Sequence, residues 1–418
     1  MNRRIATIVV GIGLSSSAYA VEWSMNTTLR ETLELSDNPF QRGTAAAGVG
    51  SYSSYLGHIT GQTKRSRFDF DADFTYKKYW GPAADVGGSL AETTDNGLKL
   101  HYEMLGKTPG DKNTFDAIWR RRNAALAILD DLGVPSNATG DIHTTTVQGG
   151  IERALTPTDF WTWNSRATST NYVPSSGGVQ YYDVTTTSTF RHQSNRTSAL
   201  TGLTEFEWLK YDNTTQTNIM IIRYMAGFNI QPYKNVSFVA SGGAATVIIE
   251  QGEIPLVVNP FATVPSSAVA SGFIGNATLT YKFWPTTELT LVASRTIAPS
   301  VIGALTTRET VGASIRHTIN PQSSLTTRVD LTRQKLVNGQ TDFITTSATY
   351  SKTLARDWNF DLTYRYTHRS ATTGTTNITF DPITGQLILL NGTNTDSATS
   401  NTIFFVLSKR FVHLPKRT

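Results

Sequence analysis

The sequence of 418 residues has no cysteine, and after Leu14 it has no long apolar run. The lack of cysteine excludes a disulfide framework, which a large exported soluble protein often carries. Because no run reaches about 18 apolar residues, a transmembrane helix is excluded as well. If this chain lies in a membrane, it must be there as a closed β-barrel, the other structure that satisfies every backbone group in lipid.

The sequence is also poor in charge and in chemical motifs. Charged residues make up 17% of the chain and the net charge is +5, a weak and diffuse excess that does not indicate a nucleic-acid partner. No phosphate-binding or dinucleotide-binding glycine loop is present, and the 7 histidines show no metal-ligand spacing such as His-x-x-x-His. We therefore expect no enzyme, no cofactor and no metal.

The first residues have the pattern of an export signal. Met1–Arg4 is short and positively charged, Ile5–Leu14 is apolar, and Ala18-Tyr-Ala20 is a small-x-small cleavage site. The sequence therefore predicts a signal peptide over residues 1–20, cleaved near Ala20, and a mature chain that begins at Val21.

What the sequence does contain is long alternation of apolar and polar residues. The clearest case is Arg67–Lys77, where Phe68, Phe70, Ala72, Phe74 and Tyr76 alternate with Asp69, Asp71, Asp73 and Thr75. Successive residues of a β-strand point to opposite faces, so one face is apolar and the other is charged. Residues 357–367 and 273–283 repeat the pattern.

These alternating runs last roughly 10–14 residues, the length of a tilted membrane strand and longer than the strands of a soluble sandwich. Trp80, Trp284 and Trp358 stand at run ends, as in an interfacial aromatic girdle. The pattern favours a membrane barrel, with a large soluble all-β protein as the alternative.

Short and variable connections alternate along the chain. They predict an all-β fold, a transmembrane antiparallel up-and-down barrel of about 18 strands with short periplasmic turns and longer extracellular loops. We expect the barrel over residues 21–411 and a periplasmic tail over 412–418.

Three segments need separate interpretation. Residues 114–132 are predicted as a strand over 114–122 and a loop helix over 124–132, because one continuous helix would leave an odd strand count. The apolar connection Gln251–Ala270 is expected to fold into the barrel mouth or to contact a partner. The long polar segment Ser370–Asp396 is expected to be a loop.

Several short motifs resemble the β-barrel porin family associated with exopolysaccharide and PEP-CTERM (exosortase) loci. They are Leu29-Arg-Glu-Thr-Leu-Glu-Leu-Ser-Asp-Asn38, Tyr79-Trp-Gly-Pro82, Arg153-Ala-Leu-Thr-Pro157 and Leu407-Ser-Lys-Arg-Phe411. The resemblance implies an outer-membrane barrel that serves polysaccharide or other envelope export, and supplies no catalytic residues. A last strand that ends in the aromatic Phe411 is similar to the signal read by barrel-assembly machinery.

Charged residues that alternate with apolar ones are the candidate lumen-facing residues. They are Asp69, Asp71, Asp73, Lys99, His101, Glu103, Arg120, Arg308, Arg316, Arg328 and Arg365. They could form charged rings that set pore selectivity, or a solvated wall of cross-strand pairs that neutralise one another. The aspartate row could bind a hard cation, or pair with Arg67, Lys77 and Lys99. The acidic strand and the Arg308/Arg316 strand should lie roughly seven neighbours apart in a ring of about 18.

The sequence thus predicts a channel in the outer membrane of a Gram-negative bacterium, reached through the periplasm. A non-transporting partner of surface polysaccharide machinery is the alternative, and a barrel enzyme such as a lipid hydrolase is the third hypothesis. The expected partners are outer-membrane lipid, the assembly machinery, and polysaccharide or small polar solutes, with no nucleic acid.

Overall fold

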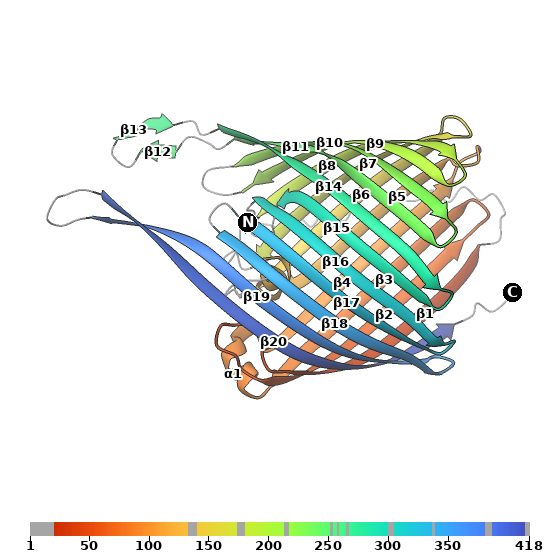
Figure 1. Cartoon of the computed structure of the whole chain (residues 1–418), viewed down its shortest axis with the longest axis horizontal. Coiled ribbons are helices and arrows are strands. Elements are labelled where there is room, and N and C mark those ends of the chain that lie inside the picture. The colour runs from red at the N-terminus through yellow and green to blue at the C-terminus, as the bar shows by residue number, and fades with distance from the viewer. Residues whose placement is uncertain are drawn as a thin grey trace, which may run out of the picture.

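A computed structural model shows a closed antiparallel barrel of 18 strands (Figure 1). It describes residues 21–413 apart from 133–139, 174–179, 213–216, 251–253, 257–258, 265–266, 300–304, 337–338 and 381–386. The first and last strands pair with each other, from Met25 opposite His413 to Ser36 opposite Thr402, and so close the ring. The predicted fold class and strand number are confirmed. The predicted signal peptide lies outside the described residues.

The barrel strands follow one another around the ring in chain order. They are β1 (Glu22–Ser36), β2 (Gly48–Gln62), β3 (Ser66–Trp80), β4 (Glu92–Leu105), β5 (Lys112–Asn123), β6 (Asp141–Ala154), β7 (Asp159–Val173), β8 (Tyr181–Asn195), β9 (Ser198–Tyr211), β10 (Asn218–Tyr233), β11 (Val236–Glu250), β14 (Ser267–Trp284), β15 (Thr287–Pro299), β16 (Leu305–Asn320), β17 (Ser323–Leu336), β18 (Gly339–Ala355), β19 (Trp358–Phe380) and β20 (Leu387–His413). The elements that are not part of the ring are α1 (Pro82–Gly87), the 3₁₀ helix η1 (Gly88–Leu90), α2 (Ala124–Leu132) and a separate sheet of β12 (Ile254–Leu256) and β13 (Asn259–Val264).

The two ends of the barrel differ. At one end, here called the turn end, β1 begins, β20 ends and tight turns join the strands, as at 63–65 and 285–286. The other, the loop end, carries α1, η1 and α2 (Figure 1). None of the helices in the described part of the chain is long and apolar enough to cross a membrane.

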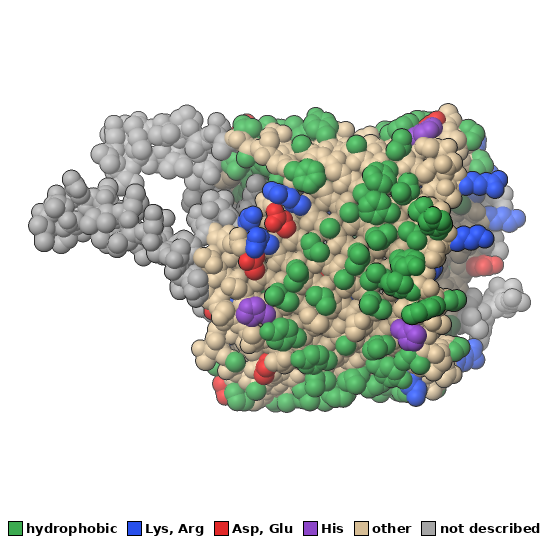
Figure 2. Space-filling view, in the orientation of Figure 1, with side chains coloured by type: hydrophobic (Ala, Val, Ile, Leu, Met, Phe, Trp, Pro, Cys, Tyr) green, Lys and Arg blue, Asp and Glu red, His purple; other side chains and the backbone are tan. Residues whose placement is uncertain are grey.

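The alternating pattern places apolar side chains on the outside. Phe70 lies opposite Ile59 and Phe74 opposite Tyr55 on the same face, and 47% of Phe74 is exposed. In Figure 2 hydrophobic side chains cover much of the visible outer wall. Among the described residues, the buried apolar clusters all lie near the loop end, and the rest of the barrel wall shows no apolar core.

The predicted division of residues 114–132 is confirmed, because β5 ends at Asn123 and α2 begins at Ala124. The predicted loop Ser370–Asp396 is wrong. β19 and β20 stay paired as far as Phe380 opposite Leu387 and extend beyond the rim of the barrel (Figure 1). This segment lacks apolar alternation because a hairpin beyond the barrel wall pairs its own backbone and needs no apolar face.

Two boundaries also differ from expectation. β20 runs through His413, beyond the expected end at Phe411. The apolar connection Gln251–Ala270 contributes β12, β13 and the start of β14, and its remaining residues lie outside the described part.

Candidate functional site: the lumen wall

The strand register places the candidate residues on the inner face of the wall. Asp69 lies opposite His101, which lies opposite Asp116, so one row crosses β3, β4 and β5. This row belongs to the face opposite the exposed Phe74. The same alternation puts the other candidates on the inner face, including Asp71, Asp73, Lys99, Glu103, Arg120, Arg308, Arg316, Arg328 and Arg365.

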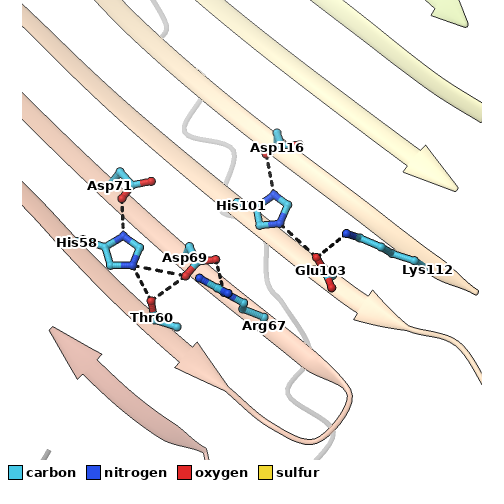
Figure 3. Close-up of polar contacts among 9 residues, drawn as sticks. All are labelled: His58, Thr60, Arg67, Asp69, Asp71, His101, Glu103, Lys112 and Asp116. Carbon is cyan, nitrogen blue, oxygen red and sulfur yellow. Dashed lines mark hydrogen bonds and ion pairs between the residues drawn. The ribbon is translucent and has the colours of Figure 1, made fainter. Parts of the chain in front are cut away.

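A hydrogen-bonded network connects β2 and β3 (Figure 3). His58 Nδ1 lies 2.5 Å from Asp71 Oδ1, and His58 Nε2 lies 2.8 Å from Thr60 Oγ1. Thr60 donates to Asp69 Oδ1 at 2.7 Å, and Arg67 Nε donates to Asp69 Oδ2 at 2.7 Å. Two of the three aspartates in the predicted row are therefore hydrogen-bonded to basic side chains.

The network has a counterpart on β4 and β5 (Figure 3). His101 Nδ1 lies 2.8 Å from Asp116 Oδ1, and Lys112 Nζ lies 2.7 Å from Glu103 Oε2. His101 Nε2 lies 3.8 Å from the same Glu103 oxygen. The sequence pointed to His101 and Glu103, but it did not single out His58, since a lone histidine in a strand carries no signal of its partners.

These contacts favour charge pairing over a cation site at the aspartate row. Lys77 pairs with Asp95 at 3.7 Å, not with the row itself. Asp73 lies over the bare backbone of Gly97, where a Cβ would be 2.2 Å from Asp73 Oδ1. Among the described residues, no group of three or more acidic, histidine or cysteine side chains is arranged to hold a metal ion.

Thr60, His58 and Asp71 are ordered like the nucleophile, base and acid of a hydrolase. The hydroxyl of Thr60, however, donates to Asp69. β2 also pairs with β1 and β3 throughout this stretch, so its backbone N–H groups are already used and cannot stabilise an oxyanion. The geometry thus fits an ion-pair network better than a catalytic site.

A second set of ion pairs crosses β7 to β10. Arg166 Nη2 lies 3.1 Å from Asp183 Oδ2. Arg223 contacts both Glu205 and Glu207, the latter at 2.6 Å, and its side chain is only 11% exposed. Both arginines and both glutamates line a cavity of about 470 Å³ on the inner wall. The alternation of Glu205 and Glu207 with Phe206 and Trp208 indicated their face, but Arg223 was missed because register between strands cannot be read from one sequence.

The opposite side of the lumen carries arginines. Arg308 and Arg316 lie on β16 and, among the described residues, have no carboxylate within ion-pair distance. Arg316 lines a polar cavity of about 410 Å³ together with Arg30 and Asp361. On the neighbouring strand β17, Arg328 pairs with Asp330 at 2.5 Å.

The acidic and arginine-rich strands are well separated around the ring. β3 and β16 are seven positions apart, with β2, β1, β20, β19, β18 and β17 between them. On the arginine side Arg365 lies over the ring of Phe404, 4.7 Å from its centroid. The lumen therefore has one side of paired acids and histidines and another of less completely paired arginines.

A buried cluster lies at the loop end of the barrel. Phe40, Tyr79, Ala83, Leu90 and Ala125 form a buried cluster that joins the first loop, β3, α1, η1 and α2. The Tyr79 hydroxyl donates to Glu34 Oε2 at 3.0 Å.

The first loop, residues 37–47 between β1 and β2, is also held by Arg369 of β19. The fully buried Arg369 donates to the carbonyl oxygen of Gln41 at 3.1 Å and pairs with Asp396 at 2.6 Å.

Comparison with known proteins gives no family. No family profile matches the chain, and no curated protein matches it. The motifs that resemble exopolysaccharide-associated porins therefore gain no support.

Solved outer-membrane barrels align over most of the chain at very low identity. The ferric yersiniabactin uptake receptor FyuA from Yersinia pestis is 8% identical, with 93% of this chain and 80% of the receptor covered and a TM-score of 0.42. The FrpB iron transporter from Neisseria meningitidis is 6% identical, with 93% and 81% covered and a TM-score of 0.49. OccK2 (OpdF) from Pseudomonas aeruginosa is 8% identical, with 94% and 98% covered and a TM-score of 0.45. Likeness at this level says nothing about the solutes of this chain.

Proposed function

We propose that this protein is an outer-membrane channel for small polar solutes. The observation that carries the proposal is the closed ring of 18 paired strands with apolar side chains outside and charged side chains inside. A ring of this kind satisfies backbone groups in lipid, and at about 18 strands its interior is wider than side chains alone can fill.

The outer surface supports a membrane location. Large apolar side chains are exposed on it, such as Phe74 at 47% and Val311 at 58%. Trp284, 66% exposed, and Trp23, 49% exposed, stand at the turn end, where an aromatic girdle would meet one interface. The turn end would then face the periplasm and the loop end the cell exterior.

The inner surface supports a polar solute. The network on β2 to β5 and the arginines of β16 and β19 offer hydrogen-bond donors and acceptors on both sides of the lumen. The cluster around Phe40 and Tyr79 narrows the loop end and favours small solutes. Transport of polysaccharide rests only on the short motifs of the sequence and remains a prediction.

A planar-bilayer recording of the purified mature protein tests the proposal. We expect steady conductance steps in potassium chloride, with an ion preference that changes when the charged lumen residues are replaced. A folded, membrane-inserted protein that never conducts would contradict the channel and would favour an assembly partner of the envelope, for which the projecting β19–β20 hairpin offers a surface.

A further inference from the structure

The wall of the barrel opens between β14 and β15 in its loop-end half. The two strands pair from Trp284 opposite Thr287 up to Gly275 opposite Arg295. Beyond that point Ser267–Ile274 of β14 pairs only with β11, and Thr296–Pro299 of β15 pairs only with β16. Both strands continue past their last shared pair without hydrogen bonding to each other.

The end of β15 leaves the wall and turns into the lumen. Arg295 and Ile297 are two residues apart, so in a straight strand they would point the same way. Instead Arg295 pairs with Glu309 on the outer face at 3.2 Å, whereas Ile297 packs in the inner apolar cluster with Ile274 and is 8% exposed. The departure of β15 from the wall leaves the edge of β14 uncovered.

Two cavities meet at this opening. The inner cavity of about 470 Å³, described above with Arg166 and Arg223, reaches Gly275, Asn276 and Arg295. A cavity of about 490 Å³ on the outer face is lined by the same Gly275, Asn276 and Arg295. Inside and outside are therefore adjacent at the last paired residues, where Gly275 has no side chain to separate them.

The surroundings indicate which molecule fits. The outer cavity is apolar, between Phe228, Phe273 and Val311, and the inner cavity has the apolar Met225, Ile274 and Ile297 in its lining. A hydrocarbon chain would find apolar surface on both sides of the opening. The opening lies between two neighbouring strands and is therefore narrow. A narrow opening admits an amphiphile with one hydrocarbon chain more readily than a lipid with several chains.

A charged group on the outer wall lies beside the opening. It consists of Arg295, Glu309, Arg333, Lys335 and Asp342, in ion pairs of 3.2 Å, 4.0 Å and 2.8 Å. Three cations face two carboxylates, which leaves one positive charge for an anionic headgroup. Figure 2 shows Lys/Arg and Asp/Glu side chains gathered on this outer wall toward the loop end.

We propose that the gap between β14 and β15 is a lateral portal, through which a single-chain anionic amphiphile passes between the lumen and the outer leaflet. The chain lies between Phe228 and Phe273 and reaches Met225 and Ile297 in the inner cavity, while the headgroup is held at Arg295. The portal rests on the proposed membrane location but not on ion conduction, so the two can fail separately.

Binding is tested with the mature protein in nanodiscs of neutral phospholipid, by titration with anthroyloxy-labelled stearate. Ala277→Trp fills the outer cavity, and the control Ala348→Trp adds the same bulk to the outer face of β18. Arg295→Gln removes the headgroup contact, and the control Arg121→Gln removes an outer arginine that pairs with Asp141.

We expect saturable binding to the wild type, weakened about tenfold by Ala277→Trp and about fivefold by Arg295→Gln, with both controls within about twofold. Wild-type protein without saturable binding, or Ala277→Trp binding as tightly as Ala348→Trp, overturns the proposal. If Ala277→Trp fails to fold, Phe273→Ala replaces it, because this exposed side chain lines the same cavity.

Lateral passage is tested separately with a fluorescent label. The chain has no cysteine of its own, so a single introduced cysteine takes the label at one site. A bimane label on Asn276→Cys at the opening should be quenched by contact with lipids that carry a nitroxide on the acyl chain. The same label on Thr290→Cys, which lies in the paired part of β14 and β15 and lines neither cavity, should not be quenched. Equal quenching at the two positions would contradict a lateral opening, whatever the conductance of the channel.

Discussion

Arg223 on β10 donates a hydrogen bond to the backbone carbonyl of Ile297 on β15 at 2.6 Å, although β11 and β14 lie between their strands. The same guanidinium contacts Glu205 and Glu207. One arginine, 11% exposed, therefore fixes the inward position of the β15 end and forms ion pairs with two inner carboxylates.

Replacement of Arg223 by Gln should destabilise the folded barrel by about 3–5 kcal/mol, because Glu207 would remain buried without its partner. The control Arg328→Gln breaks the more exposed pair with Asp330 and should cost about 1 kcal/mol or less. Urea titration followed by heat-modifiable gel mobility measures both. Equal midpoints for the two variants would show that Arg223 does not stabilise the wall.

The inside–outside assignment predicts opposite outcomes for two adjacent residues. Phe74→Arg should cost roughly 2–4 kcal/mol, because Phe74 faces lipid near the middle of β3. Thr75→Arg should cost little, since Thr75 bonds to Ser54 on the inner face, where water solvates the new charge. Similar losses of folded protein for the two would contradict the assignment.

How far the sequence predicts this molecule depends on the range of the interaction. The alternation of apolar and polar residues along Arg67–Lys77 is a local pattern. It therefore predicted which residues of β3 face outward and inward, and it predicted the fold class. Contacts such as Arg223 with Glu207 depend on register between strands, which a single sequence does not reveal. The inward turn of β15 is likewise set by a partner distant along the chain, and nothing around Ile297 indicates it.

The charge asymmetry of the lumen predicts a change in ion selectivity. Replacing Asp69, Asp71 and Asp73 together by Asn removes the carboxylate partner of Arg67 and the carboxylate opposite Lys99, so permeation should shift toward anions. The shift should fade at high salt, because screening acts over about 8 Å at roughly 0.15 M. Reversal potentials measure it. The reciprocal pair Arg308→Gln and Arg316→Gln should shift permeation toward cations, and a shift of the same sign in both would contradict the assigned asymmetry.

The narrowing at the loop end should depend on Phe40, which is 2% exposed and packs against Tyr79 with ring centroids 4.9 Å apart. Phe40→Ala removes the aromatic contact of the first loop and should raise single-channel conductance. Phe283→Ala, which shortens an exposed aromatic on the outer face, is the control and should leave conductance unchanged. Identical conductance in the Phe40 variant and the wild type would show that this cluster does not limit the pore.

Whether the barrel is a channel is tested by single-channel recording from the purified protein in a planar bilayer, after heat-modifiable mobility has shown that the barrel is folded. We expect steady conductance with an ion preference that the Asp69/Asp71/Asp73 variant changes. A folded and inserted barrel that stays electrically silent would contradict this expectation.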